Sequence, residues 1–97
     1  MLFMMRYTFR PGECARQAYL RFAKWSPSEG FEIKAGWTTA SNDGGFLLLD
    51  VVNVEALVHF SAQFKDLNDT LDITPVVELG DGVAIAMKAY EWIDSVS

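Results

Sequence analysis

Three aromatic side chains and one amide are the groups in this sequence best suited to hold a small molecule. Aromatic rings offer flat apolar surface, and their hydroxyl and indole groups, like an amide, can orient a ligand by hydrogen bonding. We predict that these residues line a cavity between a sheet and its helices; they are Tyr7, Tyr19, Trp37 and Asn42. The sequence also allows the alternative that the rings simply fill the core and leave no pocket.

Side chains that usually carry catalysis or bind metals are sparse. The chain has one histidine and one cysteine. Helical periodicity places His59 toward solvent and Cys14 on a buried stripe, so we interpret them as a surface histidine and a packed thiol. Asp66, Asp69 and Asp72 crowd a turn, but the glycine and terminal glutamate of an EF-hand loop are missing. The sequence therefore predicts no metal site and no cofactor, and it identifies no catalytic residue.

The composition is that of one small domain, residues 1–97, with a large apolar content. Hydrophobic residues make up 51% of the chain, and 13 acidic against 8 basic side chains give a net charge of −5. This charge would repel phosphate backbones, so we predict no nucleic-acid partner. No apolar run approaches the roughly 18 residues that a membrane span requires, so we predict no membrane partner. A single cysteine suits a reducing compartment, which predicts a cytoplasmic location.

Apolar periodicity predicts the elements that must position these groups. The expected strands are 2–9, 31–40, 44–51 and 70–79. The first expected helix runs from near Pro11 to about Trp25, the second from near Asn53 to about Asp66, and the third from near Gly80 to about Asp94. This is the α+β, ferredoxin-like β-α-β-β-α-β plan with a C-terminal helix and an antiparallel four-stranded sheet. Residues 44–51 are apolar on both faces, which predicts a covered central strand. Pro75 cannot donate to a ladder, which predicts an edge strand, and Asn68-Asp69 should form the turn before it.

Residue alternation assigns the faces of this sheet. The residues expected to face the helices are Phe3, Met5, Tyr7 and Phe9 in the first strand; Phe31, Ile33, Ala35 and Trp37 are expected to share one face of the second strand. Gly36 indicates a bulge or a close backbone approach. The last helix carries apolar groups on two sides and so needs two surfaces to bury them.

The sheet face away from the helices would be exposed to solvent in a monomer. This predicts a homodimer in which two sheets pack face to face. The residues that we assign to this interface are Leu2, Met4, Arg6, Asp72 and Val76. We favour an interfacial ion pair between Arg6 and Asp72, which would fix the register of the dimer, over a charged site inside the barrel.

Short segments spread over nearly the whole chain carry a family resemblance. They are Met1-Leu2-Phe3-Met4 with Tyr7 and Phe9, Gly36-Trp37, Gly44-Gly45-Phe46, Phe64 with Leu67, and Ile73-Thr74-Pro75-Val76. Through them the chain resembles a small, functionally uncharacterised bacterial domain family of the dimeric α/β-barrel group. The resemblance implies this fold. The wider group includes cofactor-free monooxygenases, haem-dependent enzymes and ligand binders, so the resemblance transfers no catalytic motif.

Two functions are compatible with these observations. The first is a homodimeric binding or regulatory module that takes a small apolar or aromatic molecule, or a protein. The alternative is a cofactor-independent monooxygenase- or isomerase-like enzyme acting on a small aromatic or polyketide-like compound. In the enzyme, the resemblance implies that Tyr7 and Trp37 would orient the ring, with Asn42 as a polar contact. We favour the binding module.

Overall fold

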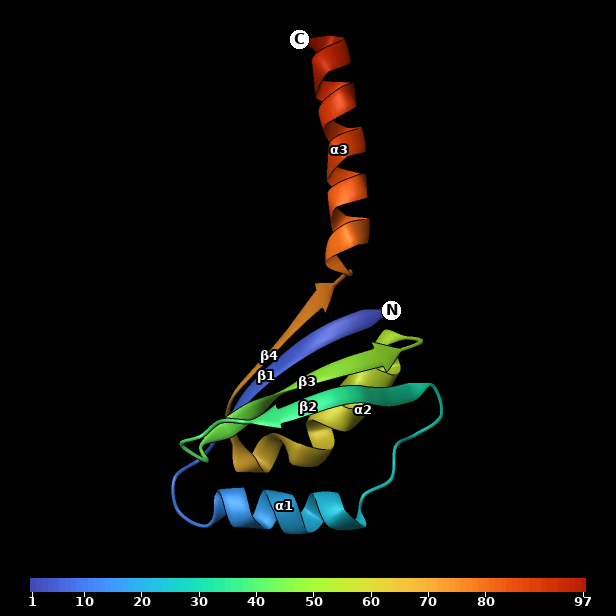
Figure 1. The fold of residues 1–97 in the computed structure, drawn as a ribbon. Coiled ribbons are helices and arrows are strands. Elements are labelled where there is room, and N and C mark those ends of the chain that lie inside the picture. The colour runs from blue at the N-terminus through green and yellow to red at the C-terminus, as the bar shows by residue number, and fades with distance from the viewer.

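The computed structural model describes all residues from Met1 to Ser97. Its elements follow the predicted order (Figure 1): β1 (Leu2–Phe9), α1 (Cys14–Lys24), β2 (Phe31–Thr38), β3 (Gly44–Val51), α2 (Val54–Phe64), the short 3-10 helix η1 (Lys65–Leu67), β4 (Asn68–Val76) and α3 (Leu79–Val96). The α+β class and the β-α-β-β-α-β-α order are therefore confirmed.

The four strands form one open antiparallel sheet in the order β2-β3-β1-β4. The predicted positions are confirmed: β1 and β3 lie in the centre, and Pro75 lies in the edge strand β4. This is the strand order of the split βαβ plan. No helix of the chain combines the length and the apolar character that crossing a bilayer requires.

Two predicted boundaries near β4 are wrong. Asn68 and Asp69 already belong to the strand, because η1 makes the turn that was assigned to them. The strand also ends at Val76 rather than at Leu79, and α3 begins at Leu79. Only Val77 and Glu78 therefore connect β4 to the last helix.

The core lies between the sheet and α2. Leu49 and Val51 of β3 are the most completely buried large side chains. Phe31 stacks on Phe60 of α2 with ring centroids 4.7 Å apart. The start of α2 is fixed as predicted, because the Asn53 side chain accepts a hydrogen bond from the backbone N–H of Ala56 at 2.9 Å.

A bulge in β2 overturns one predicted face. Ile33 pairs with Leu49, but the register shifts before Ala35, which pairs with Leu48. Directly opposed residues of neighbouring strands share a face. Ala35 therefore turns to the side opposite to Ile33, as does Trp37, which pairs with Phe46. The prediction that Phe31, Ile33, Ala35 and Trp37 share a face is wrong because strict alternation fails at a bulge.

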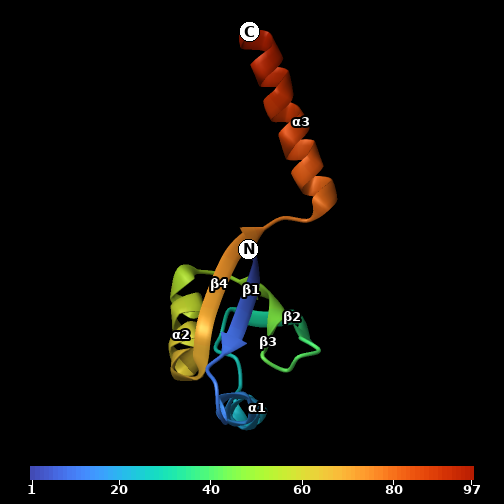
Figure 2. The same ribbon diagram turned by 90° about the vertical axis from the view of Figure 1, so that its left-hand side faces the viewer.

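The other sheet face has no covering element in the single chain. Phe46 of β3 is exposed on it, and Leu48 is half-buried. Strand β3 is thus central, as predicted, but it is covered on one face only. Helix α3 does not fill this space, because it leads away from the sheet beyond the end of β4 (Figures 1 and 2).

Candidate functional site

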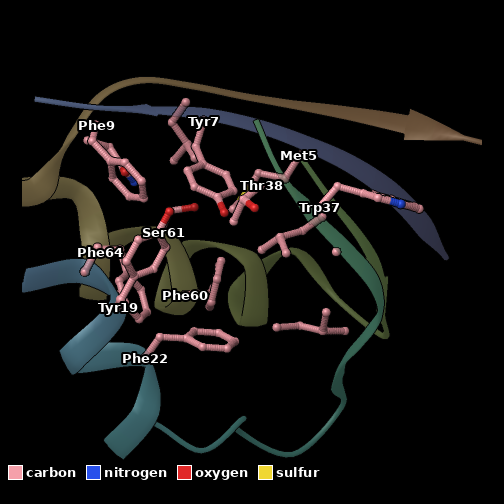
Figure 3. Close-up of a pocket in the computed structure, with 16 residues that line it drawn as sticks. Met5, Tyr7, Phe9, Tyr19, Phe22, Trp37, Thr38, Phe60, Ser61 and Phe64 are labelled. Carbon is pink, nitrogen blue, oxygen red and sulfur yellow. The ribbon is translucent and has the colours of Figure 1, made fainter. Parts of the chain in front are cut away.

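A cavity of about 500 Å³ lies between α1, α2 and the helix-facing side of the sheet (Figure 3). Twelve of its sixteen lining residues are hydrophobic, and none carries a charge. The lining residues are Met5, Tyr7, Phe9, Ala18, Tyr19, Phe22, Ile33, Gly36, Trp37, Thr38, Leu47, Phe60, Ser61, Phe64, Asn68 and Leu71. This volume and apolar character are typical of small-molecule sites. In the single chain the rings leave space beside one another, in a cavity that opens to solvent.

The cavity exists because α1 is anchored to the rest of the domain at one end. At the C-terminal end, Trp25 packs edge-on against Phe60 at 5.2 Å and donates from its indole nitrogen to Gln63 Oε1 at 2.7 Å. Arg21 forms a two-pronged ion pair with Asp66, at 2.7 and 3.0 Å. Toward the other end, the only buried residue of the helix is the small Ala18, which lines the cavity. A larger side chain there would occupy this space.

Tyr7 lies in a row of four cross-strand neighbours on the cavity side of the sheet, beside Leu71 of β4. It pairs with Gly45 of β3, which pairs in turn with Thr38 of β2. A methyl group on Gly45 would collide with the Trp37 carbonyl oxygen and would lie 2.6 Å from the Tyr7 hydroxyl. The absence of a side chain at Gly45 is therefore what allows the Tyr7 ring to lie across β3.

The Tyr7 hydroxyl has no hydrogen-bond partner in the protein, and the side chain is half-buried. Burial, with a smaller contribution from nearby Tyr19, raises the pKa of Tyr7 above its ordinary value of 10.0. The phenol therefore stays protonated at neutral pH and can donate a hydrogen bond to a guest molecule. It is not suited to act as a general base at that pH.

Tyr19 is held beside the cavity by two contacts. Its hydroxyl donates to Asn42 Oδ1 at 2.7 Å, and its ring meets Phe9 edge-on at 5.6 Å. Asn42 itself adopts a left-handed backbone, with φ of 59°, which asparagine tolerates better than most residues. The amide predicted as a polar contact thus reaches the site through Tyr19, because it does not line the cavity itself.

The loop that presents Asn42 is braced by Asp43. Its carboxylate accepts hydrogen bonds from the hydroxyls of Ser41 and Thr39, each at 2.7 Å. These bonds lower the pKa of Asp43, the bond from Ser41 contributing most. The ionised carboxylate therefore helps to fix the loop above the Tyr19 hydroxyl.

Trp37 lines the cavity only at its margin. Its side chain is 54% exposed, and its indole points away from the rings of Phe9, Tyr19 and Phe22 (Figure 3). The bulge in β2 is the cause, because it turns Trp37 toward the face that carries Phe46. The four predicted ligand-binding residues are thus brought to one end of the domain, but only Tyr7 and Tyr19 direct rings toward the cavity.

The phenylalanines that form most of the aromatic wall were not predicted as site residues. Phe9, Phe22, Phe60 and Phe64 all line the cavity, and periodicity alone places each of them on the apolar side of its strand or helix. No sequence signal identifies them as cavity residues, because a ring that borders a cavity and a ring that fills a core follow the same periodicity.

The other residues weighed for chemistry lie outside the cavity. His59 is exposed, which confirms the surface assignment, and Cys14 is half-buried. No group of three or more histidine, cysteine or acidic side chains could hold a metal ion. Arg6 and Asp72 are register partners but form no ion pair in the single chain. The Arg6 guanidinium instead lies over the Phe46 ring, 5.8 Å from its centroid.

Comparison with known proteins identifies a family but no function. Residues 1–90 match a family described as a domain of unknown function, DUF3303. This match confirms the resemblance to an uncharacterised small domain family. No curated protein and no solved structure matches the chain.

Proposed function

We propose that the chain, which belongs to the DUF3303 family, is a homodimeric module that binds a neutral, ring-bearing small molecule in its aromatic cavity. The observation that carries this proposal is a cavity of about 500 Å³ whose lining is aromatic and free of charged side chains. Sites of roughly 300–1,000 Å³ suit drug-sized ligands. A charged ligand would lose its hydration there without gaining an opposite charge, so the lining favours a neutral one.

The polar groups of the cavity support orientation of a ligand. The Tyr7 hydroxyl is unpaired and protonated, so a carbonyl or hydroxyl oxygen of the ligand can accept a hydrogen bond from it. The Tyr19 hydroxyl already donates to Asn42 and therefore offers a lone pair. One donor and one acceptor on opposite walls would favour a ring bearing a polar substituent.

The homodimer is proposed on the uncovered sheet face. Leu2, Met4 and Val76 remain partly accessible there, beside Arg6 and Asp72. A second copy related by two-fold symmetry would cover these apolar groups, and the guanidinium and carboxylate could then pair across the interface. The single cysteine supports a reducing, cytoplasmic setting for this dimer.

An enzyme is the second candidate, on the observation that two tyrosines line the same apolar cavity. A cofactor-independent monooxygenase or isomerase would use them to position a small aromatic or polyketide-like substrate. The raised pKa of Tyr7 argues against its use as a base, which is why binding is the preferred function. Turnover of a bound ligand, measured by mass spectrometry with and without oxygen, would establish the enzyme instead.

A pair of fluorescent probes tests the binding proposal. N-phenyl-1-naphthylamine is a neutral aromatic amine, and 1-anilinonaphthalene-8-sulfonate shares its rings but carries a sulfonate. We expect saturable binding of the neutral probe and binding of the anionic probe weaker by about tenfold or more, because the cavity has no cation to offset the charge.

Two substitutions on different sides of α1 test whether the neutral probe binds in the cavity. Ala18→Leu should fill the cavity and abolish saturable binding of the neutral probe, because Ala18 is buried in the lining. Ala23→Leu is the matched control, since Ala23 is exposed on the same helix. Equal binding to both variants, or no saturation with the native chain, would contradict a ligand site in this cavity.

A further inference from the structure

Helix α3 has an apolar surface that nothing in the single chain covers. None of its 18 residues is buried. Leu79, Ile85 and Trp92 are 83%, 61% and 66% exposed. The helix stands apart from the sheet and from both other helices (Figures 1 and 2). An isolated helix gains little from propensity alone in water, so its stability requires a packing partner.

The apolar surface of α3 is wider than one neighbouring helix could cover. At 100° per residue, Asp81, Lys88 and Glu91 fall within one narrow strip, and Ala84 lies among them. Apart from Asp94, which lies between Val83 and Met87, most of the remaining circumference is apolar. Its exposed large side chains are Leu79, Val83, Ile85, Met87, Tyr90, Trp92, Ile93 and Val96. A helix packed against a single surface usually shows an apolar stripe only somewhat wider than about 100°. This surface therefore requires contacts on at least two sides.

The excess surface that the single chain exposes is large enough to form the interface of a stable dimer. The chain exposes 6,997 Å², about 1,400 Å² more than the surface expected for a folded monomer of its mass. Its radius of gyration is 17.1 Å, against about 12.5 Å for a compact domain of this length. If two copies each buried the excess, the interface would total about 2,800 Å², which falls in the range of obligate homodimers.

The chain itself and a membrane are weaker candidates for covering α3. Only Val77 and Glu78 separate β4 from α3, and the helix leads away from its own sheet (Figure 1). Folding back onto that sheet would require a full reversal within this connection. Helices that lie on membranes usually have a basic polar face, but the polar strip here has two acids and one lysine, in a chain of net charge −5.

We propose that α3 is an interchain arm, whose apolar surface packs against a second copy of this chain. The match to the family extends through Tyr90, so most of the arm belongs to the family's sequence pattern. The arm deepens the proposed homodimer, because it adds a contact beyond the sheet face. It does not depend on the cavity binding any ligand.

Three charge-introducing variants of the full chain test the arm. Trp92→Glu and Tyr90→Glu place a carboxylate on two different sides of the apolar surface. Ala84→Glu is the matched control, because it adds the same charge within the polar strip. Sedimentation velocity should show twice the 10.9 kDa of one chain for the native protein. We expect the dimer dissociation constant to rise by about tenfold or more in both test variants and to stay unchanged in the control.

The outcomes separate the arm from the other proposals. A native protein that sediments as a single chain overturns the arm and the sheet-face dimer together, whereas binding of the neutral probe would still report on the cavity. Dimers unaffected by all three substitutions overturn the arm alone. Native binding to phosphatidylcholine–phosphatidylglycerol vesicles that Trp92→Glu abolishes, without a change in dimerisation, would assign α3 to a membrane and overturn the arm. Circular dichroism checks that each variant keeps its fold.

Discussion

The two ends of α1 meet the rest of the domain in opposite ways. At the C-terminal end, Trp25 lies against the rings of Phe31, Phe60 and Phe64, within 6.2 Å between centroids. Nearer the other end, at the middle residue of the helix, Tyr19 has one ring contact and one hydrogen bond, and the cavity opens beside it. We refer to these as the closed end and the open end.

The difference suggests how a small domain can keep an internal space without losing its fold. The closed end gathers the aromatic burial and the Arg21–Asp66 ion pair, so α1 stays attached to α2 and η1. The open end can then leave apolar surface unpaired, at the cost of the dispersion contacts that a filled core would make. Stability and ligand capacity are thus assigned to different ends of one helix.

The largest expected effect is a loss of unfolding free energy when a phenylalanine at the closed end is replaced, compared with one at the open end. Phe31→Ala should lower the free energy of unfolding by about 3–5 kcal/mol, because the ring is buried between Trp25 and Phe60. Phe9→Ala should cost clearly less, because the Phe9 ring already borders the cavity and loses fewer contacts. Urea unfolding at a single protein concentration measures both values.

Equal losses for these two variants would contradict the distinction between a closed and an open end. The slope of the free energy with urea must stay the same in both variants for the comparison to hold. A fixed protein concentration is needed because a dimer's apparent stability depends on it.

A smaller effect is expected from the hydrogen bond that holds the open end. Tyr19→Phe removes the donor to Asn42 Oδ1 and should cost about 0.5–1.5 kcal/mol, nearer the lower limit because the side chain is partly exposed. Tyr7→Phe is the matched control, since Tyr7 lines the same cavity and its hydroxyl makes no hydrogen bond in the chain. Thermal unfolding monitored by circular dichroism should separate the two, and identical midpoints would show that this bond does not stabilise the open end.

The architecture could be predicted because its signals are local. The doubly apolar run of β3 identified a central strand, Pro75 identified an edge strand, and Asn53 identified a helix start. Each signal depends on a backbone constraint or a side-chain period that neighbouring residues already determine.

The site could be predicted only in part, because its geometry depends on residues far apart in the chain. Tyr7 and Tyr19 were identified from their chemistry, but the bond from Tyr19 to Asn42 spans 23 residues. The bulge that turns Trp37 away is a property of the pairing with β3, which no alternation pattern in β2 reveals. The height of α1 above the sheet follows from anchors at Arg21 and Trp25, and periodicity gives no measure of it.

The smallest expected effect concerns the ion pair at the closed end. The hydrogen bonds from Arg21 lower the pKa of Asp66 below its ordinary value of 3.8. A carboxyl group whose pKa is lower in the folded state stabilises the fold fully above its unfolded pKa, and that contribution is lost as the pH falls through the folded value. Because both side chains are exposed, solvent screens the pair and the contribution is small.

Asp66→Asn should therefore lower the unfolding midpoint slightly at pH 7, and its difference from the native chain should disappear below the lowered pKa of Asp66. Asp69→Asn is the control, because Asp69 is exposed, lies three residues away and makes no ion pair. Thermal unfolding of all three proteins between pH 7 and pH 2 measures this. A difference between native chain and Asp66→Asn that persists at the lowest pH would show that the anchor depends on the shape of the side chain rather than its charge.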